Sequence, residues 1–82
     1  MPWFDIIWDD GPGGNVIHLA EHGVMPDEAE EVLMHPAKVE RSRSSGRCIA
    51  FGRTREGRNL AVVYEEVDRV TVLPVTAFDL EA

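Results

Sequence analysis

The sequence predicts a small α+β domain in which two helices cover one face of an antiparallel sheet. Its 82 residues, 44% of them hydrophobic, suit one domain spanning residues 1–82. Runs rich in β-branched and aromatic residues occur at the N-terminus and repeatedly in the second half, with two segments of helical spacing between them. Short turns separate the later runs, which favours antiparallel neighbours. The predicted element order is therefore β-α-α-β-β-β-β.

The first strand is predicted over residues 3–8, which are rich in aromatic and β-branched side chains. A strand's period of two places Phe4, Ile6 and Trp8 on one face. A cluster of acidic, glycine and proline residues at positions 9–14 then predicts a turn that ends the strand.

A short helix is predicted over residues 16–22. Asn15 suits its N-cap position, because the side-chain oxygen can accept a hydrogen bond from a free backbone N–H of the first turn. Gly23 suits the left-handed residue that commonly follows a helix. These two residues set the expected bounds of the helix.

A second helix is predicted to begin at Pro26, whose missing N–H costs nothing in a first turn, and to end near His35-Pro36. Apolar residues at helical spacing should face the core: Ala29, Val32 and Leu33. Acidic residues line another side, which predicts a solvated face made of Glu28, Glu30 and Glu31.

Four strands are predicted in the second half of the chain, over residues 38–43, 47–54, 58–65 and 69–77. The third of them has the clearest alternation, with Leu60, Val62 and Tyr64 on one face, and we expect it at the centre of the sheet. Pro74 in the last strand indicates a sheet edge or a bulge, because proline cannot donate a ladder hydrogen bond.

Charge is distributed unevenly along the chain. The formal net charge is −7, yet residues 38–58 contain seven of the eight basic residues and only two acidic ones. Residues 1–37 contain eight acidic residues and no Lys or Arg. The basic segment could bind phosphate groups or an acidic partner protein. It could equally form a solvated hairpin of alternating charges, or pair with the acidic second helix.

The arginines of this segment are candidate phosphate ligands, because a guanidinium binds phosphate through two parallel hydrogen bonds and stabilises charge that develops on it. Strand periodicity places Arg41 and Arg43 on one face, and Arg47 and Arg53 on one face. The remaining members of the set are Arg55 and Arg58.

A sheet that presents such side chains could hold a single-stranded RNA backbone. Aromatic side chains on the same sheet could then stack on a base. Phe51 and Tyr64 are the two aromatic candidates near the arginines.

His18 and His22 are the candidate proton-transfer residues. Their i, i+4 spacing places both on one helix face, and imidazole exchanges a proton near neutral pH. Two histidines at this spacing could also bind a metal, but no third ligand stands at a recognisable spacing, so the sequence predicts no metal site and no cofactor. Ordinary packing or surface histidines are the alternative at both positions.

Neither a disulfide nor a membrane span is expected. Cys48 is the only cysteine, and no apolar run approaches the roughly 20 residues that a spanning helix needs. The N-terminal residues show no basic start followed by a long apolar run, so we expect no secretory signal and a cytoplasmic location.

Several short motifs, in order and spacing, resemble those of the BrnT-type toxins, which are small RelE-like ribonucleases of bacterial toxin–antitoxin pairs. The matching stretches are Trp8-Asp9, His18 to Val24, Pro26 to Ala29, His35-Pro36 and Gly57 to Tyr64. The chain departs from the family pattern at Glu21, where the family has Lys, and at Phe78, where it has Arg.

The resemblance implies the toxin component of a type II toxin–antitoxin system, with metal-independent endoribonuclease activity in which the RNA 2′-hydroxyl attacks the adjacent phosphate. It implies that His22 shuttles the proton and that Arg47 and Arg58 complete the catalytic set. The residues expected to bind RNA are Arg41, Arg43, Arg53 and Tyr64. The implied partners are RNA and a small DNA-binding antitoxin protein, and a homo-oligomer is a further expectation. The alternative is a non-catalytic protein-interaction module of the same fold.

Overall fold

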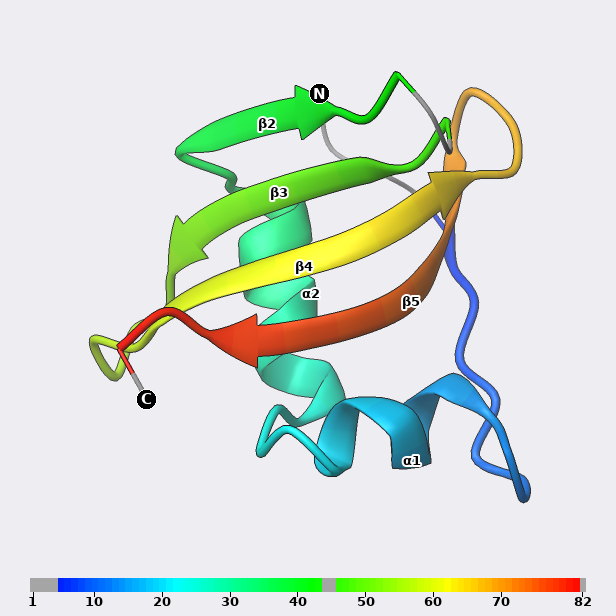
Figure 1. The fold of residues 1–82 in the computed structure, drawn as a ribbon, viewed down its shortest axis with the longest axis horizontal. Helices are drawn as coiled ribbons and strands as arrows, with labels where there is room; N and C mark the ends of the chain where they lie inside the picture. The colour runs from blue at the N-terminus through cyan, green and yellow to red at the C-terminus, as the bar shows by residue number, and fades with distance from the viewer. Residues whose placement is uncertain (1–4, 44–45, 82) are drawn as a thin grey trace.

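The computed structural model describes residues 5–43 and 46–81, and it confirms an α+β fold with the predicted element order (Figure 1). Trp3 and Phe4 of the predicted first strand lie outside the described residues. The elements are β1 (Asp5–Ile6), α1 (Asn15–Ala20), α2 (Pro26–Met34), β2 (Lys38–Arg41), β3 (Cys48–Arg53), β4 (Asn59–Glu66) and β5 (Thr71–Asp79). Most bounds differ from the predicted ones by one or two residues, as helix and strand ends commonly do.

The sheet has five strands in the order β1-β5-β4-β3-β2, so β4 is central, as predicted. Strands β2 to β5 form the predicted antiparallel meander. The first strand departs from the prediction because β1 pairs with β5 in parallel, through Asp5↔Thr71 and Ile6↔Val72. The sheet is therefore mixed. Both helices lie between β1 and β2 in the chain, and this long connection lets β1 join the opposite edge of the sheet.

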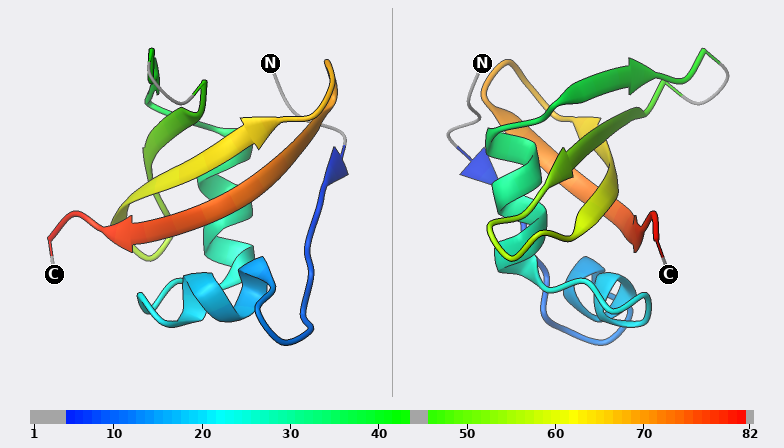
Figure 2. Two further views of the ribbon diagram at one scale, coloured as in Figure 1. Left: turned by 45° about the vertical axis from the view of Figure 1, so that its right-hand side comes forward. Right: turned by 90° about the vertical axis from the view of Figure 1, so that its left-hand side faces the viewer.

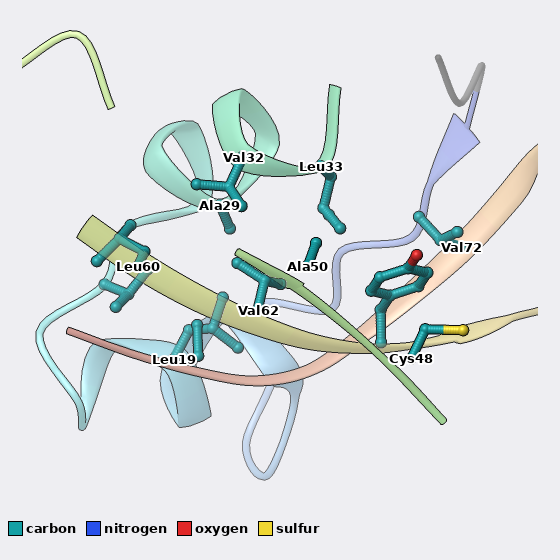
Figure 3. Close-up of a cluster of buried hydrophobic side chains, with 12 residues drawn as sticks. Leu19, Ala29, Val32, Leu33, Cys48, Ala50, Leu60, Val62 and Val72 are labelled. Atoms are coloured by element: carbon teal, nitrogen blue, oxygen red, sulfur yellow. The ribbon is translucent and has the colours of Figure 1, made fainter. Parts of the chain in front are cut away.

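Both helices lie on one side of the sheet, with α2 packed against β3 and β4 and α1 packed against β5 (Figure 2). The predicted core face of α2 is confirmed, since Ala29, Val32 and Leu33 are buried. Side chains from α1, α2 and the sheet meet in a single cluster (Figure 3). Gly52 lets α2 approach β3 closely, because a Cβ at this position would lie 3.2 Å from Cγ1 of Val32.

The two ends of α1 are formed differently. At the C-terminal end the prediction is confirmed, because Gly23 has φ of 75° and the Val24 N–H donates back to the Leu19 carbonyl. At the N-terminal end Gly14 is the N-cap, and Asn15 is the first helical residue, so the predicted cap is wrong by one position. The structure uses the Asn15 side chain in another way.

The Asn15 amide joins three parts of the chain. Its oxygen accepts from the Asp9 N–H at 2.8 Å, and its nitrogen donates to the carbonyls of Ile7 at 2.8 Å and Pro74 at 2.9 Å. This one side chain therefore ties α1 to the segment after β1 and to β5.

Pro74 lies at a bulge, one of the two predicted alternatives. The register of β4 with β5 shifts there, from Val63↔Thr76 to Tyr64↔Pro74. The Pro74 carbonyl accepts from Asn15, and the N–H and C=O of a strand residue point to the same side. The Pro74 nitrogen, which carries no hydrogen, therefore faces away from β4. Its lack of a donor costs no hydrogen bond between β4 and β5.

The predicted solvated face of α2 is instead held by the rest of the fold. Glu28 pairs with Arg58 at 2.7 Å and also accepts from the Met25 N–H. Glu30 accepts from the Trp8 indole at 2.7 Å, and Glu31 accepts from the Arg55 N–H at 2.8 Å. Each acidic side chain has a partner from a distant segment, which sequence spacing alone could not reveal.

The side of the sheet opposite the helices, hereafter the open face, carries an apolar centre. The strand register places Phe51, Ala61 and Phe78 in one row across β3, β4 and β5. Ile49, Val63 and Thr76 form the next row. Phe78 remains 39% exposed. The open face is thus apolar at its middle, and its charged residues lie toward the strand ends.

Candidate functional site

A cleft of about 370 Å³ lies where α1 meets the bulge of β5. Its α1 side is formed by the loop after β1 and the first helical turn, and its floor is formed by residues 73–75 of the bulge. Four ionisable side chains line it: Asp9, His18, Arg47 and Glu65. The Asp9 carboxylate accepts a hydrogen bond from the Gly11 N–H within its own loop, so the other three are the candidate reactive side chains. The remaining lining residues are Gly13, Gly14, Asn15, Leu73, Pro74 and Val75.

The three reactive side chains come from different elements. The strand register that pairs Cys48 with Tyr64 places Arg47 directly opposite Glu65 on the open face, and the Arg47 Nε lies 3.3 Å from Glu65 Oε2. His18 comes from α1, whose position beside β5 is fixed by the Asn15 hydrogen bonds. The bulge and the helix therefore bring an imidazole to the same cleft as an arginine–carboxylate pair.

All three groups are accessible to a ligand. The side chain of His18 is 51% exposed, that of Arg47 is 44% exposed and that of Glu65 is 45% exposed. His18 Nδ1 also lies 3.9 Å from Glu21, outside the cleft lining. Such an arrangement offers an imidazole, a carboxylate and a guanidinium to one bound molecule.

His22, the predicted proton carrier, lies next to the cleft without lining it. Its ring centroid is 5.8 Å from that of His18, and the two ring planes are tilted by 59°. The i, i+4 spacing found both histidines, but the spacing could not tell which of them meets an arginine. The structure places His18 and Arg47 in the lining of one cleft and leaves His22 outside that lining.

Arg58, the second predicted catalytic residue, joins elements of the fold. It forms ion pairs with Glu28 at 2.7 Å and Asp79 at 3.1 Å, and it donates to the Gly23 carbonyl at 3.0 Å. The hydrogen bonds that the guanidinium donates to Glu28 and Asp79 raise its pKa above the ordinary value. With a side chain only 30% exposed, Arg58 links the start of α2 to β5 and has few donors left for a phosphate.

The arginines predicted to bind RNA do not gather at one place. Arg41 pairs with Glu66 at 2.6 Å, and this hydrogen bond raises the pKa of the guanidinium. Arg43 lies beyond the end of β2, whereas Arg53 ends β3 at the opposite end from Arg47. Within the described ranges, neither Arg43 nor Arg53 forms a salt bridge. Acidic neighbours pair with several cations of the predicted positive segment, but most of these neighbours do not belong to the acidic second helix. Arg41 and Arg47 pair with β4, and among the described residues only Arg58 forms an ion pair with α2.

Tyr64 is a core residue, and this placement corrects its prediction as a base-stacking side chain. It is 3% exposed on the helix-covered face, beside Cys48. Burial, together with the neighbouring Cys48, raises the pKa of the phenol to about 12. Phe51, the other aromatic candidate, lies half-buried on the open face, where a base could reach it.

Glu65 is the cleft residue that sequence reasoning missed as a reactive group. The sequence did contain a signal for this placement. The predicted strands 47–54 and 58–65 are separated by a turn at residues 55–57, and pairing them across this turn places residue 65 opposite Arg47. His18 could be placed only by the packing of α1 against β5, which no local pattern encodes.

Among residues 5–43 and 46–81, no group of three His, Cys, Asp or Glu side chains is arranged to hold a metal ion. Over the same residues, no helix has the length and apolar character needed to cross a membrane. Comparison with models of protein families, with curated proteins and with solved structures finds no match to this chain. The resemblance to BrnT-type toxins therefore rests on the sequence motifs alone.

Proposed function

We propose that this protein cleaves single-stranded RNA at the cleft of His18, Arg47 and Glu65, as the toxin of a toxin–antitoxin pair. The observation that carries the proposal is the meeting of these three side chains in one accessible cleft. Cleavage through the RNA 2′-hydroxyl needs a base, an acid and a positive charge beside the phosphate. A carboxylate, an imidazole and a guanidinium supply these three functions without a metal ion.

In the proposed reaction, the Glu65 carboxylate takes the proton of the 2′-hydroxyl, and the 2′-oxygen forms a bond to the adjacent phosphorus. The bond from phosphorus to the 5′-oxygen of the next nucleotide breaks. His18, in its protonated form, donates its proton to that leaving oxygen. The products are one RNA end with a 2′,3′-cyclic phosphate and one with a 5′-hydroxyl.

Arg47 has two parts in this scheme. Before RNA binds, its ion pair holds the Glu65 carboxylate on the open face. When a phosphate enters, the guanidinium donates to the non-bridging oxygens and stabilises the negative charge that grows there. An arginine beside the base therefore positions the carboxylate and neutralises the phosphate.

Purified protein and a labelled single-stranded RNA, incubated with a chelator, provide the test. We expect His18→Ala, Glu65→Gln and Arg47→Ala each to lower the cleavage rate by about 100-fold or more. His35→Ala and Arg55→Ala serve as matched controls, since both residues are exposed and lie outside the cleft lining. These controls should cleave at the native rate.

His22→Ala separates the cleft assignment from the one that the resemblance implies. The cleft assignment expects this variant to stay within about tenfold of the native rate, because His22 contacts His18 but not the cleft. Loss of cleavage in His22→Ala, with full activity in His18→Ala, would show that His22, and not His18, transfers the proton. Intact RNA with every folded variant and with the native protein would eliminate the ribonuclease.

The apolar centre of the open face favours a second candidate function, a non-catalytic module that binds another protein. Phe51 and Phe78 are partly exposed on either side of the buried Ala61, with charged residues beyond them. Interfaces commonly combine an apolar centre with a polar rim. The partner would be a small DNA-binding antitoxin encoded beside this chain. Binding of the partner should be lost in Phe78→Asp and kept in His18→Ala. Binding that is kept in Phe78→Asp and lost in His18→Ala would show that the partner does not bind the open face.

A further inference from the structure

We infer that two copies of this protein associate through β2, edge to edge and antiparallel, to form one continuous sheet. Strand β2 ends the sheet, and all four of its residues are exposed. The opposite edge is β1, which has only two residues. The described structure thus has a single extended edge able to accept another strand. This inference does not depend on the proposed ribonuclease activity.

The backbone of β2 decides which residues face the second copy. The Ser42 N–H donates to the Arg47 carbonyl at 2.7 Å, so the backbone groups of Ser42 point toward β3. A strand's hydrogen-bonding groups alternate from side to side along the chain. Those of Glu40 and Lys38 therefore also point toward β3, and those of Val39 and Arg41 point outward.

Hydrogen bonding restricts the register of a symmetric antiparallel pair, because outward-facing residues must lie opposite outward-facing residues. The two-fold axis must therefore pass through a residue of β2. An axis at Lys38, Glu40 or Arg41 would place two identical charges directly opposite each other, which destabilises a strand pair. An axis at Val39 avoids this.

With the axis at Val39, the two valines face each other across the interface, and each can exchange its outward N–H and C=O with the other. Val39 is 48% exposed in the single chain, so the pair would cover the exposed part of an apolar side chain. Lys38 of each copy would then lie opposite Glu40 of the other.

The charges of β2 complement themselves in this register. Within one chain the Lys38 Nζ lies 2.9 Å from Glu40 Oε2, with both side chains on the open face. Two copies would bring these pairs together into four alternating charges, two from each chain. Such an association is closed, because it uses the extended edge of both copies and leaves, among the described residues, two β1 edges of two residues each.

The oligomeric state of the purified chain, measured by sedimentation over a range of concentrations, tests this inference. We expect a reversible monomer–dimer equilibrium in the native protein. Lys38→Glu alone would place two acidic residues opposite each other, and Glu40→Lys alone would place two lysines opposite each other. Each single variant should weaken dimerisation by at least about tenfold.

The double variant Lys38→Glu with Glu40→Lys reverses both charges and restores every opposite pair, so its dimerisation should return to near the native level. Phe78→Asp provides a matched control on the open face and should leave the dimer intact. A native protein that stays monomeric at all concentrations would overturn the inference. So would a dimer that survives both single charge reversals, or one that is lost only in Phe78→Asp.

Discussion

Arg58 shows how a single residue can serve the fold at a position where the resemblance implies catalysis. Arg58→Ala would leave the partly buried carboxylates of Glu28 and Asp79 without their cation. We expect the free energy of unfolding to fall by about 1–2 kcal/mol, at the lower end for such groups because the guanidinium is partly exposed. Urea denaturation measures this change.

Arg55→Ala is the matched control for Arg58, since Arg55 is exposed and uses only its backbone N–H to bind Glu31. Its free energy of unfolding should change by less than about 0.5 kcal/mol. An Arg58→Ala protein with native stability and no cleavage would contradict the structural role and support direct catalysis by Arg58.

Tyr64 should make the fold sensitive to alkaline pH. A tyrosine in an unfolded chain ionises near pH 10, whereas the pKa of Tyr64 in the folded protein is about 12. Its contribution is therefore fully present below about pH 10 and is lost as the pH rises toward 12. Tyr64→Phe keeps the ring but cannot ionise, so its stability should fall less over this range. Circular dichroism measures the loss of folded protein as the pH rises. An equal loss of stability in the native protein and in Tyr64→Phe would show that Tyr64 does not control the alkaline sensitivity.

At the scale of elements, the Asn15 side chain fixes α1 against the sheet. Asn15→Ala removes three hydrogen bonds that hold the segment after β1, the start of α1 and the bulge of β5. We expect a loss of about 2 kcal/mol in the free energy of unfolding, and a lower cleavage rate because His18 loses its fixed place. Hydrogen exchange should speed up in α1 and β1.

Asn59→Ala is the corresponding control, because Asn59 makes one exposed side-chain hydrogen bond, to Glu81. Its stability should change by less than about 0.5 kcal/mol. Unchanged hydrogen exchange in α1 of Asn15→Ala would mean that packing alone holds the helix in place.

Elements with a strong local pattern could be predicted from the sequence, and those fixed by distant contacts could not. The alternation around Val62 identified the central strand, and the apolar spacing in α2 identified its buried face. The parallel pairing of β1 with β5 escaped prediction, because its partners are more than 60 residues apart and no turn links them. The cleft was partly foreseeable, since strand pairing sets Arg47 opposite Glu65, but the place of His18 depends on how α1 packs.

At the scale of the whole molecule, charge should limit the affinity for RNA. The chain carries a net charge of −7, and Glu21 lies 3.9 Å from His18, just outside the cleft lining. Glu21→Lys introduces the charge that the motif of the BrnT-type toxins has at the corresponding position, so we expect faster cleavage and tighter RNA binding at low salt. Glu56→Lys makes the same net change at an exposed turn away from the cleft and should have a smaller effect. Equal effects of the two substitutions would assign the gain to net charge alone.

The most direct measurement identifies the ends of the RNA fragments that the native protein produces in the presence of a chelator. Cleavage by Glu65, His18 and Arg47 should leave 2′,3′-cyclic phosphate and 5′-hydroxyl ends, and a strand with a 2′-deoxy sugar at the cleavage position should stay whole. His18→Ala should give neither product. Fragments with 5′-phosphate ends, cleavage of the 2′-deoxy strand, or no cleavage by the native protein would contradict the proposed activity.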